Sequence, residues 1–250
     1  MFRPRIIPVL LLKGKSLVKS VQFKNYNYIG DPINAVRLFN DLKADELVFL
    51  DIDASKEHRT IPIEIIKKIG EETNMPFAVG GGIGTIKDIK EILKAGAEKV
   101  IINSIAVKNP DFIREACDTF GSSTIAICID VKKNILGNLK TWINNGKKCT
   151  GLNPVDHAIL MEKSGAGEII IQSITNDGIM KGYDIHLVKS ISTSVSIPVI
   201  ALGGAGNLNH LVQAYKEGFA SGLAAGSMFV YQGKHKGVLI NYPDTDEKSF

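Results

Sequence analysis

Short apolar runs rich in valine and isoleucine alternate along this chain with longer segments of helical periodicity. Such alternation is typical of parallel βαβ units. Seven segments between the runs have helical patterns; one places Ile86, Ile89 and Ile92 on a single face, and another begins at Asn109 and Pro110. Eight strands with helices between them predict an α/β fold, a (β/α)8 TIM barrel. The strands are expected near residues 5–12, 46–53, 76–81, 98–103, 123–130, 168–174, 198–203 and 220–226.

The two halves of the chain repeat each other. Pro76–Gly84 reads PFAVGGGIG, and Pro198–Gly206 reads PVIALGGAG at an offset of 122 residues. This repeat predicts a single barrel (1–230) made of two half-barrels, about 1–120 and 121–230, followed by a C-terminal extension over 231–250. The extension has no amphipathic stretch long enough for a usual eighth helix, so we expect an abbreviated closing element.

Two longer stretches without clear periodicity, 13–30 and 133–152, follow the first and fifth predicted strands. We expect them to be irregular. Loops after barrel strands lie on the face where chemistry occurs, so these two stretches are predicted to be lids.

Composition narrows the function classes. The chain has 250 residues, 44% of them hydrophobic, which is enough for one large core. Its net charge is +4 and it has no block of five like charges, which argues against nucleic acid and membrane surfaces as partners. The first apolar run stops at Lys13, too early for a signal peptide or a membrane span, so we expect a cytoplasmic protein.

The cysteines and histidines show no ligand pattern. Cys117, Cys128 and Cys149 share no metal-ligand spacing, which favours buried or incidental thiols over a disulfide or a zinc site. We expect no metal and no cofactor. The histidines share no spacing either, and we expect each to lie at the surface: His58, His157, His186, His210 and His235.

Glycine-rich turns recur at the ends of the third and seventh predicted strands. Backbone N–H groups there, together with a helix N-terminus, can surround a phosphate. Glycine at a tight turn also occurs without any ligand, so each loop alone leaves both interpretations open. Their pairing with the next strand ends favours two phosphate sites, one for each end of a bisphosphate ligand. The candidate residues are Gly82, Asn103 and Ser104 in the first half and Gly203, Gly204, Ala225 and Gly226 in the second.

Nine segments over about residues 1–230 together carry a resemblance to a known family. They are Arg5–Ile7, Gly30–Pro32, Asp45–Ile52, Val79–Ile83, Ile129–Asp130, Gly165–Ile169, Asn176–Gly178, Gly182–Asp184 and Gly203–Gly206. With these segments the chain resembles the HisF family of histidine biosynthesis, the cyclase subunit of imidazole glycerol phosphate synthase. The resemblance implies a barrel docked on a HisH-like glutaminase. Ammonia would pass through the barrel to a ribulosyl-linked aminoimidazole carboxamide bisphosphate, and two essential carboxylates would stand at the ends of strands one and five.

By this resemblance Asp130 matches the second essential carboxylate, and Leu11 occupies the place of the first. A leucine cannot transfer a proton, so the acid/base pair is reduced to one member. Apolar surface also disfavours a charged intermediate. Ile179, where the family usually has a hydroxyl residue, and Leu202, before the second glycine pair, point the same way. The sequence therefore disfavours the ordinary cyclase reaction.

The resemblance also implies roles at both ends of the barrel. Lys19 matches a substrate-contacting lysine, and Asp177 with Gly178 matches a substrate contact after strand six. Glu98 lies where the family docks its glutaminase. Four charged residues match the ring through which the family admits ammonia, although spacing alone favours ion pairs that merely stabilise the barrel bottom. They are Arg5, Glu46, Lys99 and Glu168.

Three functions stay open. The favoured one is a HisF-like subunit of a glutamine amidotransferase that channels ammonia to another acceptor; it resembles paralogues associated with acetamidino modification of surface-polysaccharide sugars, in which a third protein makes the amidine. The second is the cyclase itself, with Asp130 or a lid residue such as Lys19 or Lys13 taking over the role lost at Leu11. The third is a scaffold without catalysis of its own that switches on its glutaminase when a phosphorylated ligand binds.

Overall fold

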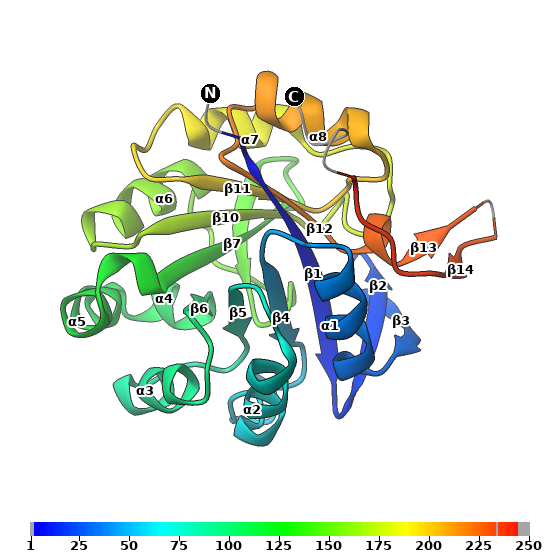
Figure 1. Ribbon diagram of the computed structural model, residues 1–250. Helices are drawn as coiled ribbons and strands as arrows, with labels where there is room; N and C mark the ends of the chain where they lie inside the picture. The colour runs from blue at the N-terminus through cyan, green and yellow to red at the C-terminus, as the bar shows by residue number, and fades with distance from the viewer. Residues whose placement is uncertain (1–2, 234, 245–250) are drawn as a thin grey trace.

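The chain forms a closed barrel of eight parallel strands (Figure 1). A computed structural model describes residues 3–233 and 235–244. The ring closes where β12 pairs with β1 and where β7 pairs with β10. The predicted barrel is confirmed. Its strands are β1 (Arg5–Lys13), β4 (Leu47–Asp51), β5 (Phe77–Gly80), β6 (Lys99–Ile102), β7 (Ile125–Lys133), β10 (Glu168–Ser173), β11 (Val199–Leu202) and β12 (Gly222–Ala225).

Helices surround this barrel in the seven predicted crossovers. Thr85 and Asp88 begin one of them with a reciprocal capping box. Pro110 opens another, and this helix start is the one that the sequence predicts. One crossover holds two helices, α4 and α5. The helices are α1 (Pro32–Asp41), α2 (Ile63–Glu72), α3 (Ile86–Lys94), α4 (Ser104–Lys108), α5 (Pro110–Phe120), α6 (Pro154–Lys163), α7 (Ile185–Ser192) and α8 (Leu208–Lys216).

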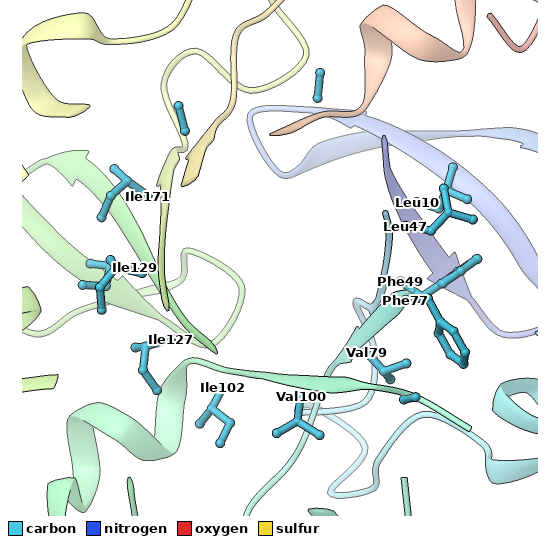
Figure 2. Packing of buried hydrophobic residues seen from close by; sticks show 14 of the residues in the cluster. Leu10, Leu47, Phe49, Phe77, Val79, Val100, Ile102, Ile127, Ile129 and Ile171 are labelled. Carbon is cyan, nitrogen blue, oxygen red and sulfur yellow. The ribbon is translucent and has the colours of Figure 1, made fainter. Parts of the chain in front are cut away.

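Each barrel strand buries both faces, which is why the strands appear in the sequence as continuous apolar runs. Successive side chains point alternately outward and inward. Leu10, Phe49 and Ile127 belong to the outward set, which packs against the helices (Figure 2). Val9 and Val48 belong to a separate inward cluster that fills the barrel. The inward positions therefore decide what lies along the barrel axis.

The two predicted lids are β-hairpins, so the expectation of irregular structure was wrong. The first consists of β2 (Ser16–Val21) and β3 (Lys24–Gly30), and the second of β8 (Leu139–Ile143) and β9 (Lys148–Cys149). β2 pairs with the end of β1, and β8 pairs with the end of β7. This pairing, rather than a periodic apolar pattern, makes them strands.

The chain beyond β12 contains no α-helix among the described residues. A 3-10 turn over Ser227–Phe229 leads into a short hairpin, β13 (Tyr231–Gln232) and β14 (Gly237–Val238), so the predicted abbreviation is confirmed. Tyr242 then packs its ring near Phe229 and donates its hydroxyl to the carbonyl oxygen of Ile6 at 2.9 Å. The segment thus covers the flank that an eighth helix would cover.

The half-barrel boundaries remain a prediction, and residues 234 and 245–250 of the expected extension lie outside the described part of the chain. None of the described helices combines the length and the apolar character needed to cross a membrane.

Candidate functional site

Four charged side chains meet at the N-terminal end of the barrel, as the sequence predicts for them. Arg5 pairs with Glu46 and, at 2.6 Å, with Glu168. Lys99 lies 3.0 Å from Glu168 and 3.6 Å from Glu46. The four side chains form a closed ring of alternating charge around the barrel axis; we call it the charged ring.

Burial and charge oppose each other within the charged ring. Burial raises the pKa of Glu46, and the positive charges of Arg5 and Lys99 counteract this. For Arg5, burial lowers the pKa, but the charges of Glu46 and Glu168 outweigh it and leave the pKa raised. Glu98, the expected partner contact, is exposed and directly precedes Lys99, the first residue of β6. The ring is therefore self-compensated in charge.

An apolar lumen begins at the charged ring. The volume that the centre of a water molecule could occupy in the lumen is about 10 Å³, which is room for about one molecule of that size. Glu46, Lys99 and Glu168 line one end, and Cys128 and Leu202 lie among the lining residues further up their strands. The walls between are inward aliphatic side chains: Ile7, Val9, Val48, Leu50, Ala78, Ile101, Ala126, Ile170, Ile200 and Ala224.

The next inward positions form the mouth of the lumen at the C-terminal end. Leu11 and Leu50 pack on the lumen cluster, to which Leu202 also belongs. Asp130 lies on β7, and the strand order puts β7 on the opposite side of the ring from β1, which carries Leu11. The structure thus places the aliphatic side chain of Leu11 across from Asp130, as the sequence predicts.

Asp130 is set to exchange a proton near neutral pH. It is only 7% exposed. Burial raises the pKa of its carboxyl to about 7; the charge of Asp177 adds to this, and hydrogen bonds with Cys128 and Asn103 oppose it. The Cys128 thiol donates to Oδ1 of Asp130 at 3.6 Å. A carboxyl with a pKa near the working pH is suited to general acid or base chemistry.

Lys19 also lies at the mouth, and it is buried rather than solvated, with 4% exposure. The first hairpin points its Nζ at the carbonyl oxygen of Val9, beside Gly226. Burial lowers the pKa of Lys19 to about 8, against the opposing charge of Asp177. Its position reflects the strand pairing of β2, which the expectation of an irregular loop missed.

Asp177 is held next to Lys19 by a network of hydrogen bonds. Its carboxylate accepts from the Ser20 hydroxyl at 3.3 Å and from the Gln172 amide at 3.2 Å. Burial raises the pKa of Asp177, and the positive charge of Lys19 opposes this. The structure therefore brings Lys19, Asp130 and Asp177 to one end of the barrel, as expected.

The predicted phosphate loops have packing reasons of their own. Gly82 has a φ of +69°, and a Cβ there would collide with the carbonyl oxygen of Arg59. Gly204 has a φ of +117°, and a Cβ there would collide with the carbonyl oxygen of Gly182. These glycines are required by backbone contact whether or not a phosphate binds.

The remaining phosphate candidates surround the same mouth. Asn103 and Ser104 stand at the start of α4, and the Ser104 hydroxyl accepts from the backbone N–H of Asn144 in the second lid at 3.2 Å. The others lie at strand ends or turns of the second half: Gly178, Gly203, Ala225 and Gly226. The candidates are thus gathered, and their use as phosphate ligands stays a prediction.

Sequence reasoning missed two residues near the site and the burial of one histidine on α6. Cys128 and Gln172 occupy inward positions, and the two-residue periodicity from Asp130 on β7 and from Glu168 on β10 could have identified them. His157 is 3% exposed, so the expectation of a surface histidine was wrong; burial lowers the pKa of its ring to about 4. Among the described residues no three histidine, cysteine or acidic side chains are grouped to hold a metal ion.

Comparisons with known proteins agree with this architecture. The family model described as histidine biosynthesis protein matches residues 5–236. The chain is 46% identical to a protein of Leptospira borgpetersenii provisionally named imidazole glycerol phosphate synthase subunit HisF, over 99% of this chain and 98% of that one. It is 43% identical to a Pseudomonas aeruginosa protein provisionally named as subunit hisF2, with the same coverage. It is 45% identical to the imidazole glycerol phosphate synthase subunit HisF of Alkaliphilus metalliredigens, over 92% of each chain. The chain therefore belongs to the histidine biosynthesis protein family, within its HisF group.

Proposed function

We propose that this chain is the HisF-like synthase subunit of a glutamine amidotransferase. It pairs with a HisH-like glutaminase, takes ammonia in through the charged ring and delivers it at the mouth above Asp130 for amidation of a surface-polysaccharide sugar. A third protein completes the acetamidino group. The membership of the HisF group supports the first part of this proposal, and the names of the relatives describe subunits of a synthase.

One observation argues against cyclisation at the mouth. Leucines occupy the inward strand positions 11, 50 and 202, and Asp130 is the acid on the strand that faces Leu11; the other acid at the mouth, Asp177, lies after β10 and next to Lys19. A cyclisation that needs two groups to move protons on opposite sides of a substrate lacks one of them here. A conduit needs no second carboxylate, because the enzyme that carries the ammonia acceptor to the mouth supplies the groups for the amidation.

The lumen supports the conduit. Its width for about one water-sized molecule and its aliphatic walls suit neutral ammonia, whereas an ion placed between such walls would lose its hydration without gaining a partner. The charged ring at the entrance is the place where ammonium can give up its proton before the apolar section.

The first test is ammonia-driven turnover of the histidine-pathway bisphosphate by the purified chain at high pH, without a glutaminase, followed by the loss of substrate absorbance. We expect no turnover from the folded chain. A rate on the order of 1 s⁻¹ or more would identify an ordinary cyclase and refute the proposal.

Leu11→Asp tests why turnover is absent, with Leu11→Asn as the matched control of similar size without an acid. We expect the aspartate variant to gain cyclisation and the asparagine variant to show none. If neither gains activity, the loss of the first carboxylate does not explain the absence of cyclisation, and the argument from Leu11 fails.

The cyclase itself is the second candidate, and the cluster of Lys19, Asp130 and Asp177 favours it, since proton-exchanging groups are retained at the mouth. It predicts that the chain rescues a histidine auxotroph lacking its own cyclase subunit. Failure of rescue, with the protein present in the cells, counts against this candidate.

A further inference from the structure

Both lids carry lysines and no acidic residue. Residues 13–30 and 133–152 together contain eight lysines and neither aspartate nor glutamate. The whole chain has 30 basic and 26 acidic residues, so the remainder of the chain has more acidic than basic side chains. The positive charge of this protein is therefore concentrated on the two hairpins.

The two hairpins meet over the mouth of the barrel. They extend β1 and β7 from opposite sides of the ring, and the Asn145 amide of the second donates to the Tyr26 hydroxyl of the first at 3.1 Å. Gly146 lies beside the ring of Phe23. The hairpins are thus one continuous surface rather than two separate charge clusters.

Six of the eight lysines are exposed, and within the described residues none of the six forms an ion pair. Unpaired like charges repel one another and destabilise the hairpins that carry them. We call this surface the lysine face: Lys13, Lys15, Lys24, Lys133, Lys147 and Lys148.

The turn between β7 and β8, at the opposite end of β8 from Asn145, adds an apolar element to the lysine face. Ile135 and Leu136 are adjacent in the turn, with relative exposures of 102% and 78%. Two neighbouring aliphatic side chains held out into water among unpaired cations are an unfavourable surface for a chain that acts alone. Apolar anchors surrounded by charge are typical of a protein docking site.

We propose that the lysine face docks the acidic surface of the enzyme that carries the ammonia acceptor, with Ile135 and Leu136 as the apolar anchor. This inference rests on the proposed function. The charged ring receives ammonia at the other end of the barrel, so the acceptor has to be sealed against the mouth that the lids cover. Charge complementarity identifies the partner's contact surface as acidic.

The test uses full-length protein in its native cells and reverses three charges of the lysine face: Lys133→Glu, Lys147→Glu and Lys148→Glu. The matched control reverses three exposed lysines on the helical flank: Lys67→Glu, Lys68→Glu and Lys90→Glu. The readouts are the amidated-sugar content of the surface polysaccharide, by mass spectrometry, and copurification of the glutaminase.

We expect the lysine-face variant to lose amidated sugar about tenfold or more while it retains its glutaminase, and the flank variant to stay near wild type. A photo-crosslinker in place of Leu136 should capture a protein with an acidic surface, and the charge reversal should abolish that capture. The same crosslinker in place of Phe219, which is exposed on another part of the barrel, should not capture it.

Three results would overturn the inference. If deletion of the chain abolishes amidation but the lysine-face variant amidates normally, the docking surface is wrong and the proposed function stands. If deletion leaves amidation unchanged, both fall. If purified chain sediments with vesicles of phosphatidylglycerol and phosphatidylcholine at physiological salt, and the charge reversal prevents this, the occupant is a membrane and not a protein.

Discussion

Asp130 links the chemistry of the mouth to the stability of the fold. Burial raises the pKa of its carboxyl from 3.8 to about 7, so between these values the folded chain holds a proton that the unfolded chain has released. The contribution of Asp130 to the free energy of unfolding is at its full value below pH 3.8, where both states hold the proton, and it is lost as the pH rises through about 7. The difference between the two pKa values corresponds to about 4 kcal/mol.

Asp130→Asn removes this titration while it keeps the shape of the side chain. We therefore expect the variant to gain stability relative to the wild type as the pH rises, by on the order of 4 kcal/mol between pH 4 and pH 8. Urea unfolding followed by far-ultraviolet circular dichroism at one-unit steps of pH measures the difference directly.

Asp156→Asn, which removes a carboxylate from an exposed position on α6, is the matched control and corrects for changes that any lost acid causes. A difference between Asp130→Asn and wild type that is the same at every pH would refute the reasoning. Asp130 would then ionise alike in both states, and the mouth would have to be open to water.

Three further substitutions test, by urea unfolding, the contacts that stabilise the barrel around the site. Tyr242→Phe removes the hydroxyl that donates to the Ile6 carbonyl and accepts from the Asp45 N–H, and we expect the free energy of unfolding to fall by about 1–3 kcal/mol. An unchanged urea midpoint would contradict this. Gly204→Ala should lower the free energy of unfolding by more than about 2 kcal/mol, because the added Cβ would collide with backbone. Gly151→Ala should lower it less, because the space beside Gly151 is open. Arg5→Met should lower the free energy of unfolding by about 3 kcal/mol at pH 7, because Glu46 and Glu168 lose the cation between them. The loss should be smaller at pH 4, where Glu46, whose pKa is raised, is protonated and no longer repels Glu168.

The barrel strands could be predicted within a few residues because parallel strands covered on both sides are continuous apolar runs. The lid strands could not. Ser16–Val21 mixes serines and a lysine with apolar residues, and it becomes a strand only because the end of β1 offers it a pairing edge. Secondary structure that depends on a distant edge leaves little local signal.

The same limit applies to the site. Sequence reasoning placed Lys19 on an irregular loop as a substrate contact, because nothing in the local sequence shows that a hairpin will form and bury it. The lysine face was missed for a related reason: its members are separated by up to 135 positions, and a search for blocks of like charge sees only contiguous runs. Inward positions such as Cys128 follow from strand periodicity once one inward residue is known.

Charged side chains are distributed differently at the two ends of the barrel, and this indicates a different function for each end. The charged ring contains two positive and two negative side chains in mutual contact, so it can pass a small polar molecule without holding an ion. The lumen beyond it admits about one water-sized molecule, which excludes any phosphorylated ligand from the interior. Whatever reacts with ammonia must therefore do so above Asp130. There the excess lysines of the lids disfavour ammonium and favour anions, so the mouth both keeps the transferred molecule neutral and attracts an acidic acceptor or partner.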